Sequence, residues 1–278
     1  MRPSNLKTKI FLDSGDPQET REVIKILGFL DGQTTNPTLI SKNPQAKERL
    51  KKGDKFTKDE IFVFYKEVIK EISQLIPNGS ISVEVYADEK TSTRDMYDQG
   101  KEMFSWIPNA HVKYPITSQG LHVAEQLIHQ GMRVNMTLCF TQEQAASVYA
   151  ATKRAKKGDV FVSPFVGRLD DLGLNGMDLI ANIIQMYKSG DGHVEVLTAS
   201  VRSLDHFLNA IKIGSDIITA PLSILKEWVA AGMFIPSLRA ISYSEINLLN
   251  SWKDYNITHK LTKKGIQKFS NDWNELIK

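Results

Sequence analysis

Apolar and polar positions follow two different periods that succeed one another along this chain. Short stretches that alternate or are apolar throughout predict β-strands, and longer stretches with apolar residues three and four apart predict amphipathic helices. The predicted strands are 10–13, 32–36, 81–85, 111–117, 133–138, 160–165, 194–199 and 216–219. The predicted helices are 17–27, 58–75, 93–106, 118–130, 142–156, 177–187, 204–213 and one that begins near Pro221.

Strands that are joined by helical crossovers indicate an α/β fold with a parallel sheet, and eight such units indicate a single (β/α)8 TIM barrel. An open doubly wound sheet is the alternative, but no Gly-x-Gly-x-x-Gly follows the first strand. We expect one domain over residues 1–278, with the barrel from about 8 to 235 and a helical C-terminal extension from about 237 to 278. Trp252 and Trp273 are expected to anchor that extension by packing.

Two lysine-rich stretches carry no apolar face of their own. Residues 42–59 are typical of a solvated excursion, with a basic partner site as a distant second interpretation. Residues 260–268 are most simply the solvated face of a helix.

Composition excludes several classes of function. A net charge of +3 over 278 residues is too small to indicate binding to nucleic acid or to a membrane surface, although one or two arginines suffice for an anionic small molecule. Cys139 is the single cysteine, so it is expected to be a buried inert thiol in a reducing compartment. The first residues lack the apolar core of a signal peptide and no run approaches 18 apolar residues, so we expect a cytoplasmic globular protein.

Lys113 is the residue that demands an explanation. It lies in the predicted strand 111–117, where Val112, Tyr114 and Ile116 alternate with it and indicate a buried position. Burial disfavours the ammonium form of a lysine and makes the neutral amine available as a nucleophile toward a carbonyl. The alternative is a structural lysine that reaches water at the strand end or pairs with a carboxylate, which is the commoner case.

Other polar residues fall at or near the C-terminal ends of the strands, the end at which TIM barrels build active sites. They are Asp13, Asn36, Glu84, Asn135, Thr137, Ser163, Arg168, Ser200 and Arg202. Each alone can be a cap, a turn residue or part of a barrel layer. Together with Lys113 they predict carbonyl chemistry on an anionic polyol. The six histidines are scattered without ligand spacing, so no metal site is expected.

Five motifs in order resemble the transaldolase family, which includes the small fructose-6-phosphate aldolases. They are Thr-Thr-Asn-Pro-Thr (34–38), Val-Lys-Tyr-Pro (112–115), Asn-Met-Thr-Leu (135–138), Ser-Pro-Phe-Val-Gly-Arg (163–168) and Ala-Ser-Val-Arg (199–202). The resemblance covers residues 10 to 233 and implies a β/α barrel that uses a Schiff base without metal or organic cofactor.

The resemblance also implies roles for the catalytic positions. Lys113 is similar to the lysine that forms the Schiff base, and Asp13 to the acid/base that moves the C4 hydroxyl proton. Glu84 and Thr137 would hold the water used in forming and hydrolysing the imine.

The remaining site positions are implied to bind substrate. Thr34, Asn36, Asn135, Ser163 and Phe165 would surround the donor, and Asn36, Asn135 and Ser163 would orient its hydroxyls. Guanidinium suits bidentate phosphate binding, so a clamp for the phosphate is implied at Arg168, Ser200 and Arg202.

Glu84 and Phe165 resemble transaldolases, since aldolase-type members carry Gln and Tyr there. The expected activity is therefore transfer of a dihydroxyacetone unit from a ketose phosphate, sedoheptulose 7-phosphate or fructose 6-phosphate, to an aldose phosphate. The alternatives are an aldolase that cleaves fructose 6-phosphate to dihydroxyacetone and glyceraldehyde 3-phosphate, and a non-catalytic sugar-phosphate-binding barrel. Family members are often oligomeric, which suggests a homo-oligomer whose C-terminal tryptophans pack on a neighbouring subunit.

Overall fold

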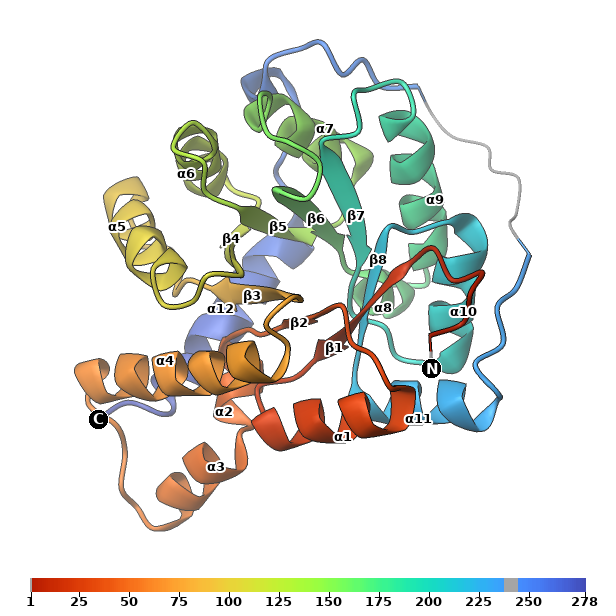
Figure 1. Ribbon diagram of the computed structural model, residues 1–278. Helices are drawn as coiled ribbons and strands as arrows, with labels where there is room; N and C mark the ends of the chain where they lie inside the picture. Colours follow the sequence, from red (N-terminus) through yellow and green to blue (C-terminus); the bar gives the residue numbers. More distant parts are fainter. Residues whose placement is uncertain (1, 238–244) are drawn as a thin grey trace.

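The computed structural model describes residues 2–237 and 245–278, and its centre is a closed barrel of eight parallel strands (Figure 1). The strands follow one another around the barrel in chain order, and β8 pairs with β1. They are β1 (Lys9–Asp13), β2 (Gly32–Thr34), β3 (Ser80–Glu84), β4 (Ala110–Pro115), β5 (Val134–Cys139), β6 (Val160–Pro164), β7 (Val194–Thr198) and β8 (Ile217–Ala220). The predicted TIM barrel is confirmed.

Helices surround the barrel. They are α1 (Pro17–Leu27), α2 (Pro37–Ser41), α3 (Pro44–Lys51), α4 (Lys58–Leu75), α5 (Thr93–Phe104), α6 (Ser118–Ile128), α7 (Gln142–Ala151), α8 (Val166–Asp170), α9 (Gly176–Tyr187), α10 (Leu204–Ile213), α11 (Leu222–Ala230) and α12 (Lys260–Asn274), with a 3-10 turn η1 (Trp252–Asp254). Within the described residues no helix is both long and apolar enough to cross a membrane.

Local signals set the helix boundaries that the sequence predicted correctly. Asp16 caps α1 by accepting from the backbone N–H of Gln18, and the left-handed Gly28 ends that helix. Thr57 and Glu60 form a reciprocal capping box at the start of α4. The bounds of α1, α4 and α10 therefore agree with the prediction.

Three short helices were not predicted, namely α2, α3 and α8. α2 and α8 span five residues each, and α3 eight, so the helical period had too few residues in which to appear. α3 belongs to the lysine-rich stretch 42–59, whose side chains are mostly solvated, but Phe56 in the same stretch is buried.

The C-terminal extension is helical only in part. Residues 245–251 are irregular, and the part of the predicted extension at 238–244 lies outside the described residues. Both predicted anchors are buried within this chain. The indole N–H of Trp252 donates to Glu125, and Trp273 packs edge-on against Tyr65 on α4.

α12 lies across the C-terminal end of the barrel, where it packs against α2 and β5 (Figure 1). Near its start, the hydroxyl of Thr262 donates to the carbonyl of Leu138 in β5 at 2.9 Å. Beyond its end, the backbone N–H of Phe56 donates to the carbonyl of Leu276, and that of Lys278 donates to the carbonyl of Phe56, each at 2.9 Å. The stretch 42–59 therefore fastens the end of the chain that follows α12.

The barrel interior changes character along its axis. Lys9 forms an ion pair of 2.9 Å with the buried carboxylate of Glu195 near the N-terminal ends of the strands. Above this pair, Phe161 packs edge-on against Phe11 and stacks on His111. These layers close the barrel below, so the polar side chains at the C-terminal end face a pocket with a solid floor.

Candidate active site

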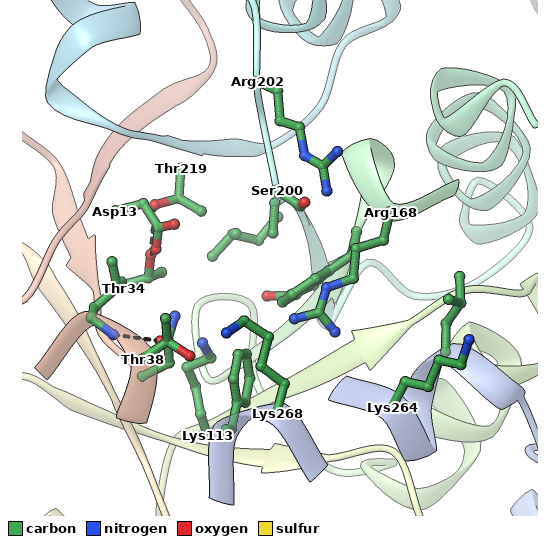
Figure 2. A pocket seen from close by; sticks show the side chains of 18 of the residues that line it. Asp13, Thr34, Thr38, Lys113, Arg168, Ser200, Arg202, Thr219, Lys264 and Lys268 are labelled. Carbon is green, nitrogen blue, oxygen red and sulfur yellow. Dashed lines mark hydrogen bonds between the residues drawn. The ribbon is translucent and has the colours of Figure 1, made fainter. Parts of the chain in front are cut away.

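A pocket of about 570 Å³ lies at the C-terminal ends of the strands, a volume typical of small-molecule sites (Figure 2). Nine of the twelve predicted site residues line it: Asp13, Thr34, Asn36, Lys113, Ser163, Phe165, Arg168, Ser200 and Arg202. The other three, Glu84, Asn135 and Thr137, are buried on the neighbouring strands β3 and β5. The structure thus brings the predicted residues together at one end of the barrel.

Lys113 faces the barrel interior because the alternation of β4 turns Val112 and Tyr114 outward toward the helices. Its side chain is buried, and its Nζ lies 2.9 Å from Oε2 of Glu84. The two residues are register partners in β3 and β4, which places their side chains on the same face. The ammonium also donates to the carbonyl of Thr35 at 3.1 Å. Lys113 is therefore buried, as its strand pattern predicted, and it is also paired with a carboxylate.

Tyr65 holds both partners of Lys113, and sequence reasoning missed it. Its hydroxyl accepts from the backbone N–H of Glu84 at 3.0 Å and lies 2.7 Å from the hydroxyl of Thr35. Thr35 gives its own proton to the carbonyl of Ser82, so Tyr65 donates to Thr35. One phenol thus joins the end of β2 to β3.

Two carboxyl groups of the site hold protons more tightly than usual. Burial raises the pKa of Glu84, although the nearby Lys113 ammonium opposes this. Burial also raises the pKa of Asp13, against a hydrogen bond of 2.6 Å that it accepts from Thr34. A carboxyl group whose pKa is raised toward neutrality is suited to exchange protons with a substrate.

A buried hydrogen-bonded row connects β3, β5 and β6. The hydroxyl of Ser163 donates to Oδ1 of Asn135 at 2.6 Å, and the amide of Asn135 donates to Ser82 at 2.9 Å. Asn36 uses its Oδ1 to cap α2, which leaves its amide N–H groups to the pocket. Thr137 differs, because its buried hydroxyl has no hydrogen-bond partner among the described residues.

Cations dominate the outer part of the pocket. The guanidinium of Arg168 is sandwiched between the rings of Phe165 and Phe269, and burial lowers its pKa. No acceptor in the described part of the chain lies within hydrogen-bonding distance of it, so its donors remain for a ligand. Arg202 is half-exposed and forms a two-point ion pair with Asp171, one contact of which measures 2.8 Å.

The turn that carries Ser200 and Arg202 packs closely against Gly167. Ser200 has a left-handed backbone with φ 59°, an unfavourable conformation for a residue other than glycine. A Cβ at Gly167 would lie 2.5 Å from Nε of Arg202 and 2.6 Å from the carbonyl oxygen of Ser200. Glycine is therefore required at 167 for Arg202 to lie where it does.

The lysines of the basic stretch 260–268 are exposed on α12, as predicted, but two of them also border the pocket. Lys264 and Lys268 of α12 line the pocket together with Leu261 and Phe269 (Figure 2). The charged residues of the lining are six cations, Lys42, Lys113, Arg168, Arg202, Lys264 and Lys268, and two carboxylates, Asp13 and Asp171. This excess of positive charge favours an anionic ligand. The sequence could have indicated this position, because Lys264 and Lys268 fall on the same side of the helix as the apolar residues Leu261 and Phe269.

A TIM barrel with a polar, cation-lined pocket at the C-terminal ends of its strands defines the class of barrel enzymes that act on small molecules. The solved structure of 3-hexulose-6-phosphate synthase from Salmonella typhimurium shares the fold. The TM-score is 0.51 at 11% sequence identity, over 82% of this chain and 98% of that chain.

The sequence comparisons identify the family. The family model described as Transaldolase/Fructose-6-phosphate aldolase matches residues 10–278. A protein of Paracoccus denitrificans named "Probable transaldolase" is 36% identical over 265 residues, which is 95% of this chain and 96% of that protein. One of Dehalococcoides mccartyi with the same name is 34% identical over 270 residues, which is 97% of this chain and 100% of that protein. The chain belongs to the transaldolase/fructose-6-phosphate aldolase family, as its motifs predicted.

Proposed function

We propose that this protein is a transaldolase that moves a dihydroxyacetone unit from a ketose phosphate to an aldose phosphate through a Schiff base on Lys113. Such a transfer belongs to the non-oxidative pentose phosphate pathway. The observation that carries the proposal is the buried ion pair between Lys113 and Glu84 in the inner part of a cation-lined pocket. An amine next to a carboxyl of raised pKa has a local acceptor for the proton that it must lose before it can attack a carbonyl.

In the first half-reaction, Glu84 takes a proton from the ammonium of Lys113, and the free amine adds to the C2 carbonyl of the ketose. Loss of water gives a protonated imine, which draws electrons from C3. Asp13 then accepts the proton of the C4 hydroxyl, the C3–C4 bond breaks, and its electron pair forms an enamine on Lys113. The aldose phosphate leaves.

In the second half-reaction, C3 of the enamine attacks the aldehyde of the acceptor, and Asp13 returns its proton to the new alkoxide. Water then hydrolyses the imine and releases the ketose phosphate that has formed from the acceptor. Thr137 supports this step because its buried hydroxyl has no partner among the residues that the structure describes and lies on β5, next to the strand of Lys113. Asn36 and Ser163 line the pocket and would bind the donor hydroxyls.

We assign the phosphate of both sugars to Arg168, Ser200 and Arg202. The Arg202→Ala variant is expected to raise KM for fructose 6-phosphate about tenfold with little change in kcat, because the clamp binds ground state and transition state alike. Steady-state kinetics measure this. Asp171→Asn is the matched variant, since it frees Arg202 from its ion pair. It should leave KM unchanged or lower it, and an increase there would place the phosphate elsewhere.

The aldolase alternative differs in what becomes of the enamine. A product assay with fructose 6-phosphate, with and without erythrose 4-phosphate, separates the two activities. We expect sedoheptulose 7-phosphate with the acceptor and little free dihydroxyacetone without it. Release of dihydroxyacetone at the same rate in both assays would establish the aldolase instead. A barrel that only binds sugar phosphates would give neither product, and borohydride would leave Lys113 unmodified.

A further inference from the structure

The C-terminal helix forms one wall of the active-site pocket. Leu261 and Lys264 are three residues apart, Lys264 and Lys268 are four apart, and Phe269 follows Lys268, so these residues lie on one side of α12, and all four line the pocket. The contact is close, because a Cβ at Gly265 would lie 2.5 Å from Nη1 of Arg168. The guanidinium that faces the pocket is thus covered by the backbone of α12.

α12 is fixed at both ends, so its side chains have defined positions. At its start, the amide of Gln144 donates to Thr262, which donates to Leu138 in β5, at 2.9 Å each. Beyond its end, backbone hydrogen bonds tie Phe56 to Leu276 and Lys278. These contacts come from distant parts of the chain and hold the helix on the barrel mouth.

Lys268 is presented to the pocket by a carboxylate. Its Nζ lies 3.1 and 3.0 Å from the two oxygens of Asp272, one turn later on α12. Asp272 also accepts the hydroxyl proton of Thr38 on the neighbouring helix α2. An ammonium has three N–H donors, and two contacts to Asp272 leave one free. In Figure 2, Lys268 extends toward the side where Lys113 and Arg168 lie, whereas Lys264 turns away.

We propose that Lys268 is a substrate-binding residue, which donates from α12 to the phosphate of the sugar while Arg168 binds it from α8. The phosphate dianion then lies between two cations on different walls of the pocket. Arg202 is shared with Asp171, so a second cation beside Arg168 adds to the binding of the dianion. Lys268 therefore makes the pocket prefer phosphorylated over unphosphorylated sugars. This inference rests on the proposed function, of which it names a further determinant of specificity.

The test compares Lys268→Gln with Lys263→Gln, which removes the same charge from the same helix but does not line this pocket. The readout is the donor concentration that gives half-maximal borohydride trapping, measured for fructose 6-phosphate and for unphosphorylated fructose. Lys268→Gln is expected to raise this concentration about five- to tenfold for fructose 6-phosphate only. Lys263→Gln should change neither value.

Two outcomes separate this inference from the proposed function. If Arg202→Ala raises the half-saturating concentration of fructose 6-phosphate and Lys268→Gln does not, Lys268 is no phosphate ligand and the proposed function stands. If borohydride traps neither sugar on the wild-type protein, the proposed function fails. Calorimetric titration with inorganic phosphate then tests, independently of that function, whether Lys268 binds phosphate. Weaker phosphate binding by Lys268→Gln than by Lys263→Gln supports the anion site, and equal binding overturns it.

Discussion

Replacement of Lys113 by alanine is expected to lower kcat by more than about a thousandfold, because it removes the amine on which we propose that the imine forms. Lys113 is the amine that is buried and that lies against the carboxyl of Glu84. The measurement combines steady-state turnover with borohydride reduction in the presence of fructose 6-phosphate, followed by mass spectrometry of the peptide that contains residue 113. We expect the reduced adduct in the wild type and none in the variant.

The fold should survive this substitution. Breaking a buried ion pair costs about 3–5 kcal/mol when the remaining charge has no partner. Glu84 can avoid this cost by binding a proton, because burial already raises its pKa and loss of the Lys113 ammonium removes the main opposing influence. Circular dichroism and gel filtration should therefore match the wild type.

Lys9 provides a matched control. It also pairs with a buried carboxylate inside the barrel, that of Glu195, but at the N-terminal end of the strands and away from the pocket. Lys9→Ala should lower stability and leave the borohydride adduct intact. If Lys113→Ala kept its turnover, or if the adduct formed on another lysine, the Schiff-base mechanism at this position would be wrong.

The part of the site that lies on the barrel strands was predictable from sequence. The position of Lys113 follows from the alternation of Val112, Tyr114 and Ile116, and this period-two pattern is a local property of the strand. Because all eight strands are parallel, their polar C-terminal residues meet at one end of the barrel. Knowing that each of these segments was a strand was enough to predict which side chains share the pocket.

The part of the site supplied by α12 was not predictable in this way. The pattern of 260–268 predicts a helix with a basic face, and a basic face is normally solvated. Its place over the mouth depends on contacts with residues far away in sequence, Thr38, Phe56 and Leu138, and no local period reports these. The same holds for Tyr65, whose aromatic ring on an amphipathic helix resembles any other core residue.

The charged residues of the site fall into two regions, to which we assign different parts of the proposed reaction. Lys113, Glu84 and Asp13 form the inner region, where burial raises the pKa of both carboxyls. Arg168 and Lys268 belong to the outer region, where the cations outnumber the carboxylates. A sugar phosphate fits this division, since it carries its reacting carbonyl at one end and its fixed negative charge at the other.

Replacement of Asp13 by asparagine is expected to lower kcat about 10²- to 10³-fold, the usual loss when a positioned general acid/base is removed. Asparagine keeps the oxygen that accepts from Thr34, so the geometry of the strand end should persist. The step that is slowed is cleavage of the C3–C4 bond, whereas imine formation on Lys113 does not require Asp13. Borohydride trapping should therefore remain strong while turnover falls, and loss of both would assign Asp13 to imine formation instead.

The pH dependence gives a second measurement. In the proposed mechanism Asp13 acts first as a base, so kcat is expected to fall as the pH is lowered through its pKa, and this acid limb should lie above 3.8 because burial raises that pKa. The limb should disappear from the residual activity of Asp13→Asn. Asp216→Asn is the control, because burial raises the pKa of that carboxyl too, but it bonds to the backbone of Val196 away from the pocket.

Stability should change in the opposite direction to activity. The folded protein disfavours the charged form of Asp13, so this group destabilises the fold above its raised pKa, and that cost is relieved as the pH falls through it. Asparagine carries no charge at any pH, so Asp13→Asn should unfold at the same temperature as the wild type or a higher one at pH 8, with a smaller difference at pH 4. A lower Tm at pH 8 would mean that the charged carboxylate stabilises the barrel mouth, which is incompatible with a proton carrier of raised pKa.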